Sequence, residues 1–370
     1  IFSLSTDGIP GKVGAQSCFS ESLTLYINIY IVVSLTFFLF CLLSVPLLVV
    51  LFQRRRMSEV AKFFEENGYA VVKGFCSPEE CAAMRGRMSA LIDAWDGKCR
   101  ATFGTGEDGR AQDKSSYFLD SADKIHFFLE NEAVDPETGN LKDFLTKHGS
   151  LNKVGHGLHV ADDVFRAYAT SEKVVNLTRE LGYQSPVLPQ SMYIFKNAKV
   201  GGEVTPHQDS TYLYTEPRPS CLGLWLALHD ATTENGCLWA RPGSHKEAVR
   251  KIWTRNPEHF EAGKADASLM VYEHLSTPKT DMEGAMEDKS FETSGKDPKE
   301  YGFVPVPINA GDLFIIHGQL EHMSLPNRSE KPRETFQLHL VEGPKAGVFW
   351  SKKNWLQYPG EKAFPSVGAS

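Results

Sequence analysis

The chain has 370 residues, of which 42% are hydrophobic and 23% charged, so its composition excludes a fibre or a disordered chain. A formal net charge of −7 gives no support for nucleic-acid binding, which needs a clustered basic face. The seven cysteines are scattered and form no Cys-x-x-Cys pair, which argues against a thiolate zinc site and against a disulfide framework.

The first part of the chain is a hydrophobic segment. Residues 23–52 carry no charge and are long enough to cross a bilayer, which needs about 20 apolar residues. Arg54–Arg56 follow directly, and the positive-inside tendency would place the rest of the chain in the cytoplasm. However, the chain begins with isoleucine, and its first methionine, Met57, stands where the globular pattern begins. Residues 1–56 are therefore interpreted either as a transmembrane anchor or as translated upstream sequence, and residues 57–370 as a cytoplasmic globular domain.

The beginning of this domain is predicted to be largely helical. The predicted elements, in chain order, are a helix at 58–67, a strand at 69–72, a helix from 77 towards 95 and a helical stretch at 164–182. The helix start at Ser77 is well marked, because Pro78 follows the capping serine and Glu80 stands three residues after it. Residues 100–150 are polar and mixed, with a glycine-rich loop near 104–109.

From Val187 onward the pattern changes to short apolar runs separated by glycine, proline and polar turns. The runs lie at 192–195, 222–228, 303–306, 313–316 and 335–341. Such a series is typical of a β-sandwich or a β-barrel. The polar stretch at 261–300 is too long for an ordinary connection, which favours a lid, a functional loop or a partly disordered segment.

The clearest chemical motif is Pro206-His207-Gln208-Asp209. In an extended segment, residues two apart point to the same face, so His207 and Asp209 can bind one ion. A second histidine would complete a two-histidine, one-carboxylate triad, which suits Fe(II) and leaves coordination positions open. His317 and His322 both follow the predicted strand at 313–316, and the spacing leaves both as candidates.

Arg333 stands eleven residues after His322, near the start of the last predicted strand. A guanidinium can hold a carboxylate through two parallel hydrogen bonds, which a lysine does less well. That is the group needed to bind the distal carboxylate of 2-oxoglutarate. The pattern of His207, Asp209, His322 and Arg333 therefore favours an oxygenase over a chance set of surface residues.

These residues stand among longer segments that resemble the phytanoyl-CoA dioxygenase family, over residues 57–359. The similar segments are Tyr117–Leu119, Asp123–Ile125, Asn152–His156, Gln190–Lys196, Gly201–Val204, Tyr214–Pro217, Glu234–Trp239, Pro242–His245 and Asn354–Leu356. The resemblance implies a mainly β fold, a double-stranded β-helix (jelly-roll) core flanked by helices. It implies His207, Asp209 and His322 as the metal ligands, with His317 as a neighbour.

The resemblance also implies a cosubstrate pocket. Arg333 matches the arginine that binds 2-oxoglutarate, and Lys153, Met192, Trp225 and Ser324 match positions that line this pocket. In that setting Lys153 adds charge near a carboxylate, and Trp225 supplies an apolar wall.

The implied activity is that of a 2-oxoglutarate-dependent dioxygenase, which uses Fe(II) and O2, with ascorbate as reductant, and releases succinate and CO2. Family members that halogenate lack the carboxylate ligand, so Asp209 favours hydroxylation. The expected partner is a small organic or acyl substrate, with no nucleic acid and with membrane contact only through residues 23–52. The alternatives are a catalytically silent jelly-roll binding protein that retains the metal pocket, and a Zn(II) hydrolase, against which Arg333 argues.

Overall fold

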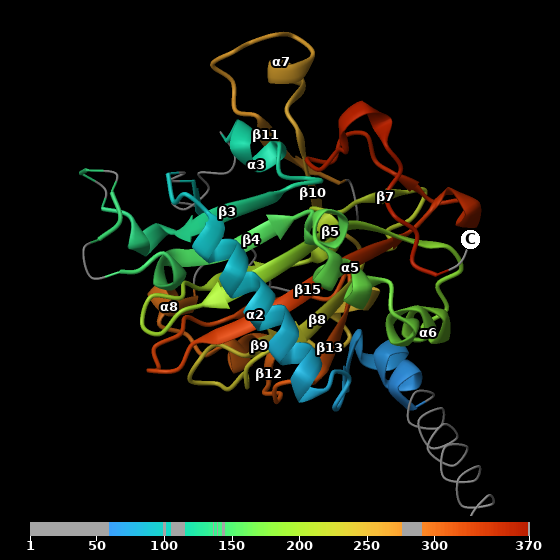
Figure 1. Ribbon diagram of the computed structural model, residues 1–370. Helices are drawn as coiled ribbons and strands as arrows, with labels where there is room; N and C mark the ends of the chain where they lie inside the picture. The colour runs from blue at the N-terminus through green and yellow to red at the C-terminus, as the bar shows by residue number, and fades with distance from the viewer. Residues whose placement is uncertain are drawn as a thin grey trace, which may run out of the picture. The chain divides into compact units, whose positions relative to one another are not determined.

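The computed structural model describes seven stretches of the chain (Figure 1). They are residues 59–98, 101–104, 115–135, 137–138, 140–142, 145–275 and 291–368. The predicted hydrophobic segment 1–56 lies outside the described residues. Within them, no helix combines the length and the apolar character that a membrane crossing requires.

The first elements follow the sequence prediction. A helix at 59–67 leads into β1 (Tyr69–Val72) and then α2 (Pro78–Ala94). Ser77 caps α2, because its Oγ accepts the N–H of Glu80 at 3.2 Å while the Glu80 carboxylate accepts the N–H of Ser77 at 2.8 Å. The expected single helical stretch at 164–182 is instead two helices, α5 and α6, which are broken at residues 170–171. Their bounds, with those of two short helices, are α3 (Ser116–Leu119), α4 (Leu158–Ala161), α5 (Asp163–Ala169) and α6 (Glu172–Glu180).

Two larger sheets form the centre of the domain. The first has eight strands in the order β1-β13-β8-β15-β5-β4-β3-β2, and the second has four in the order β12-β9-β14-β6. The further bounds of the large sheet are β2 (Thr102–Phe103), β3 (Ile125–Glu130), β4 (Leu151–His156), β5 (Pro186–Lys196), β8 (Leu222–Ala227), β13 (Leu313–His317) and β15 (Arg333–Glu342). Those of the small sheet are β6 (Val204–His207), β9 (Leu238–Ala240), β12 (Val304–Val306) and β14 (His322–Ser324). Every strand run predicted from the sequence overlaps one of these strands.

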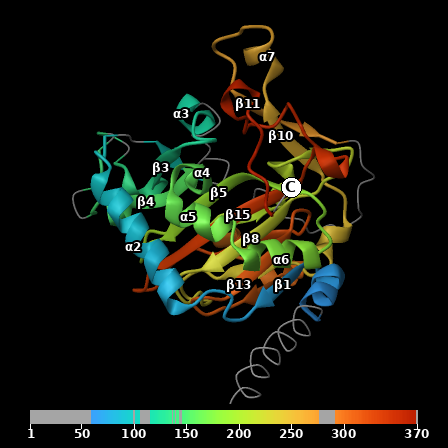
Figure 2. The same cartoon turned by 45° about the vertical axis from the view of Figure 1, so that its right-hand side comes forward.

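The two sheets face each other across a buried core. Trp225 and Phe314 of the large sheet pack in one cluster with Trp239 and Met323 of the small sheet. The opposite face of the large sheet is covered by α5 (Figure 2). The ring centroid of Phe165 in α5 lies 4.8 Å from that of Phe336 in β15. The large sheet therefore has an inner face, towards the small sheet, and an outer face beneath α5.

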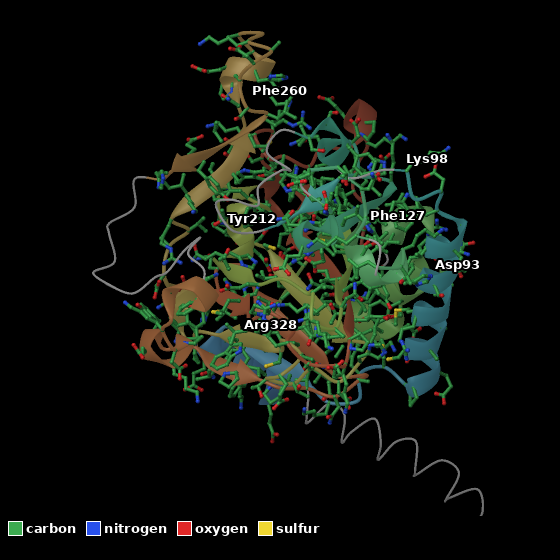
Figure 3. All side chains as sticks on the ribbon, turned by 90° about the vertical axis from the view of Figure 1, so that its left-hand side faces the viewer. Asp93, Lys98, Phe127, Tyr212, Phe260 and Arg328 are labelled. Carbon is green, nitrogen blue, oxygen red and sulfur yellow. The ribbon has the colours of Figure 1, made fainter. Side chains whose placement is uncertain are left out.

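Residues 261–300 contain regular structure, and their role as a lid or a functional loop stays a prediction. This stretch contains β11 (Met270–His274), which pairs with β10 (Lys251–Arg255), and it ends near α8 (Phe291–Ser294). With α7 (Pro257–Phe260), the β10–β11 hairpin projects from the sheets, and Phe260 lies near its tip (Figure 3). A further short pair joins β7 (Thr215–Glu216) to β16 (Phe349–Trp350).

Candidate metal centre

The three predicted ligand side chains lie together at one end of the small sheet. His207 ends β6, His322 begins β14, and the two residues are paired directly across these antiparallel strands. Asp209 follows at the start of a 3-10 turn (Asp209–Thr211). Their ligand atoms all lie within 4.8 Å of one another, which in the described part of the chain is true of no other group of three His, Cys, Asp or Glu residues.

Both imidazoles are oriented by backbone carbonyls. Nδ1 of His207 lies 2.9 Å from the carbonyl oxygen of Thr205, and Nδ1 of His322 lies 3.1 Å from that of Leu320. Because a carbonyl only accepts, each Nδ1 carries the proton, and each Nε2 has the lone pair through which a neutral imidazole binds a metal. These Nε2 atoms lie 3.5 and 3.8 Å from Oδ1 of Asp209. Two imidazole nitrogens and one carboxylate oxygen converge as the donor set of a non-heme Fe(II) site requires.

The protonation states also suit metal binding. Burial opposes the ionisation of Asp209, but the imidazoles of His339 and His322 outweigh it and hold the pKa of this carboxyl well below its usual range. Burial, followed by the neighbouring His207, lowers the pKa of His322 to about 4. Metal binding needs an ionised carboxylate and neutral imidazoles, and Asp209 and His322 meet these two requirements at neutral pH.

His317, the other histidine that the spacing allowed, lies elsewhere. Its Nδ1 accepts the backbone N–H of Gln319 at 3.2 Å, and its ring centroid is 5.2 Å from that of His245. Burial, followed by the charge of His245, lowers its pKa to about 4. His322, not His317, therefore shares the site with His207.

Four of the five predicted cosubstrate residues share the inner face of the large sheet. Residues paired across antiparallel strands point to one side, as do alternate residues of one strand. Trp225 and Met192 are both paired with Gln337 of β15. Lys153 and Thr335 are both paired with the same residue of β5, which lies between their two strands. Arg333, two residues before Thr335, points the same way, whereas Ser324 belongs to the small sheet and follows His322 by two residues.

Arg333 is a buried cation without an acidic partner. Its side chain is 2% exposed, and its guanidinium carbon lies 5.1 Å from the ring centroid of Trp225. Within the described residues its acceptor is the carbonyl of Gly236, no carboxylate pairs with it, and its Nε has no hydrogen-bond partner. The Oγ1 of Thr335 is also buried and unpartnered. Burial lowers the pKa of Arg333 to about 10, which still leaves it charged at neutral pH. Such a group fits the carboxylate of a bound ligand.

Lys153 lies in an aromatic setting. Its Nζ is 3.2 Å from the ring centroid of Phe103, with Phe118 and Phe128 also within 5.6 Å, and it lies 4.0 Å from Sδ of Met192. Burial holds the pKa of Lys153 well below its ordinary value. Its nearest neighbours are therefore π faces and a thioether.

Sequence reasoning missed a third histidine at the centre, beside His207 and His322. Nε2 of His339 lies 3.3 Å from Oδ2 of Asp209, and Nδ1 of His339 lies 3.0 Å from the side-chain nitrogen of Gln190. A signal was available, because residues 333, 335, 337 and 339 alternate along β15 and so share the inner face.

A buried ion-pair cluster was also missed. It consists of Glu321, which directly precedes His322, together with Arg241, Glu247 and Arg250. Arg241 contacts Glu321 at 2.6 Å and Glu247 at 2.7 Å, and Arg250 lies 3.1 Å from Glu321. The cluster anchors the chain beside one metal ligand to the segment that follows β9.

Comparisons of the sequence with known proteins point to one family. A family model described as Phytanoyl-CoA dioxygenase (PhyH) matches residues 64–335. Phytanoyl-CoA dioxygenase domain-containing protein 1 of Mus musculus is 42% identical over 312 residues, which cover 83% of this chain and 96% of the relative. Phytanoyl-CoA dioxygenase 1 of Oryza sativa subsp. japonica is 44% identical over 301 residues, which cover 81% and 93%.

Solved structures share the fold at low sequence identity. SnoN, described as a non-heme alpha ketoglutarate dependent epimerase from nogalamycin biosynthesis, aligns with a TM-score of 0.52 and 18% identity, covering 84% of this chain and 93% of SnoN. EctD from S. alaskensis, in its apoform, aligns with a TM-score of 0.51 and 17% identity, covering 82% of this chain and 84% of EctD. At these identities the likeness concerns the fold alone.

Proposed function

Because the chain belongs to the phytanoyl-CoA dioxygenase family, we propose that it is an Fe(II)- and 2-oxoglutarate-dependent dioxygenase that hydroxylates a small organic or acyl substrate. Membership of this family makes it an oxidoreductase of the dioxygenase type. The observation that carries the cofactor assignment is the pair of sites on facing sheets. One is the cluster of His207, Asp209 and His322. The other is the buried Arg333, which pairs with no carboxylate of the described residues.

In this proposal His207, Asp209 and His322 hold the iron. Arg333 binds the far carboxylate of 2-oxoglutarate, with the hydroxyl of Thr335 beside it. When bound together, Fe(II), 2-oxoglutarate and O2 supply an oxidant for a substrate C–H bond, with release of succinate and CO2, and ascorbate keeps the iron reduced. The protein's own contribution is to fix the ligands, orient the cosubstrate and keep bulk water from the site.

The remaining pocket residues have supporting roles in the proposal. Met192 and Trp225 form apolar walls on the inner face, and Lys153 and Ser324 complete the cosubstrate pocket. Two facing sheets, together with the folds of SnoN and EctD, support a double-stranded β-helix core. The catalytic domain is placed in the cytoplasm, which the buried free thiols of Cys76, Cys81, Cys221 and Cys237 support.

The test is succinate formation from 2-oxoglutarate by the purified protein with Fe(II) and ascorbate. We expect slow turnover without added substrate, and its loss in His207→Ala. His317→Ala is the matched control, because it removes a nearby strand-end histidine outside the metal cluster, and it should retain turnover. Binding of iron and 2-oxoglutarate without succinate, with or without candidate substrates, would favour the silent binding protein. Failure to bind iron would overturn the proposal.

A further inference from the structure

The carboxylate of Asp209 lies against the large sheet at a position where β8 has a glycine, Gly223. Gly223 of β8 is paired with His339 of β15, and His339 is paired in turn with Gln190 of β5. A Cβ atom on Gly223 would stand 3.3 Å from Oδ2 of Asp209 and 3.2 Å from Cβ of Ile316. Any larger side chain at this position would push against the carboxylate, so Gly223 leaves the space in which Asp209 lies.

The hydrogen bonding of His339 decides which of its nitrogens carries the proton. The side-chain amide nitrogen of Gln190 lies 3.0 Å from Nδ1 and donates to it, so the proton of the neutral ring is on Nε2. If the Gln190 amide were turned the other way, its oxygen would require a proton on Nδ1 of His339. The neutral ring would then point the lone pair of Nε2 at the Asp209 carboxylate, where two acceptors would face each other. In His207 and His322, by contrast, the backbone carbonyls place the proton on Nδ1. His339 is therefore arranged as a donor rather than as a metal ligand.

Nε2 of His339 faces Oδ2 of Asp209, which is buried and has no hydrogen-bond partner of good geometry. Their separation of 3.3 Å is somewhat longer than an ordinary N–H···O bond. We propose that His339, oriented by Gln190, is a positioning residue that donates its Nε2–H to Oδ2 of Asp209 in the metal-loaded protein and so reserves Oδ1 for the metal.

The arrangement has a direct consequence for coordination. A carboxylate that binds through both oxygens takes up an additional position on the ion, whereas one held through Oδ1 alone leaves that position open. The facial triad serves oxygenases because it leaves positions for a chelating cosubstrate and for O2. The inference rests on the proposed function, since it concerns a ligand of the proposed iron site.

Metal binding tests it without relying on turnover. Mn(II), which is stable in air, would be titrated into the metal-free protein and the free ion followed by electron paramagnetic resonance. Loss of a group that orients a metal ligand typically weakens metal affinity about 10- to 100-fold. We expect that loss in His339→Phe, which keeps the bulk and removes the donor. His339→Gln, which keeps an N–H at a similar reach, should recover most of the affinity.

His159→Phe is the matched control. His159 is also buried, but it bonds to Ser191 and to the carbonyl of Leu188 rather than to Asp209, so its loss should leave Mn(II) affinity unchanged. If His339→Phe does not fold, as judged by circular dichroism, Gln190→Leu decides by the same titration, and weaker binding is expected.

Wild-type affinity in His339→Phe, or in Gln190→Leu where the first variant is unfolded, would overturn the inference. So would a His339→Gln variant as impaired as His339→Phe. Absence of Mn(II) binding by the wild-type protein would instead refute the proposed iron site. The two failures are therefore distinguishable.

Discussion

Replacing Arg241 by methionine should destabilise the protein strongly, although its ion-pair partners, Glu321 and Glu247, are not proposed metal ligands. Its Nε donates to Glu321 at 2.6 Å, and its two terminal nitrogens donate to Glu247 at 2.7 and 2.8 Å. Glu321 is fully buried, and the side chain of Arg241 is 7% exposed. Without Arg241, Glu321 keeps only Arg250, at 3.1 Å, as a cationic neighbour among the contacts of this cluster.

The expected loss of stability depends on the burial of Glu321 more than on the strength of its ion pair with Arg241. Removing one partner of a buried ion pair typically costs about 3–5 kcal/mol, because an ionised group is left without compensation in a poorly solvated place. Since Arg250 remains near Glu321, we expect the lower end, about 3 kcal/mol. The double variant Arg241→Met with Glu321→Gln should recover part of this loss, because the uncompensated charge is removed with its partner.

Equilibrium unfolding in urea measures the prediction, as a shift of the midpoint at constant slope. Lys264→Met is the matched control, because the Lys264–Glu258 pair at 3.2 Å is more than half exposed on both sides and should contribute less than about 1 kcal/mol. If Arg241→Met costs no more than Lys264→Met, the reasoning is refuted. If the double variant recovers nothing, the loss arises from packing and not from the charge of Glu321.

Three further outcomes are expected. Arg333→Lys should raise the KM for 2-oxoglutarate in the succinate assay by about 10- to 100-fold, because a lysine cannot form two parallel hydrogen bonds to a carboxylate. An unchanged KM would contradict the proposal that Arg333 binds 2-oxoglutarate. Mn(II) at about 100 times its dissociation constant should raise the free energy of unfolding by about 2.7 kcal/mol, an effect that a chelator reverses and that His207→Ala should lack. Burial raises the pKa of Glu130 from 4.5 to about 7, so the folded state binds this proton more tightly and stability falls as pH rises between these values. Glu130→Gln should flatten that part of the curve of unfolding free energy against pH, and an unchanged slope would contradict the assignment.

Apolar runs located six strands, β1, β5, β8, β12, β13 and β15, because strands that are buried in the core of a sheet are rich in apolar residues. The prediction failed where polar residues have buried partners. β5 was expected only at 192–195 but extends from Pro186 to Lys196, and its polar residues Gln190 and Ser191 bond to buried histidines. The strand β3 was missed because a short apolar run in the polar stretch at 100–150 gave no alternation on which a strand could be recognised.

Only those parts of the site that depend on local geometry could be predicted from the sequence. His207 and Asp209 are close in sequence, so local geometry sufficed to join them. The choice between His317 and His322 depends on the pairing of β6 with β14, a long-range register that no local pattern encodes. Alternation along β15 places His339 on the same face as Arg333, but its 3.3 Å approach to Asp209 depends on how the two sheets face each other, which no local pattern encodes.

The position of β15 between β8 and β5 links the two proposed binding functions. Arg333 at its start and His339 near its end share the inner face, so one strand carries both the proposed cosubstrate cation and the group beside the metal carboxylate. A slip of one residue in β15 would turn both side chains to the outer face. The ladders with β8 and β5 prevent this on both sides, and the apolar residues Phe336, Leu338 and Leu340 reinforce them by filling the opposite face. The packing that stabilises the sheet therefore also aligns the proposed metal and cosubstrate ends of the site.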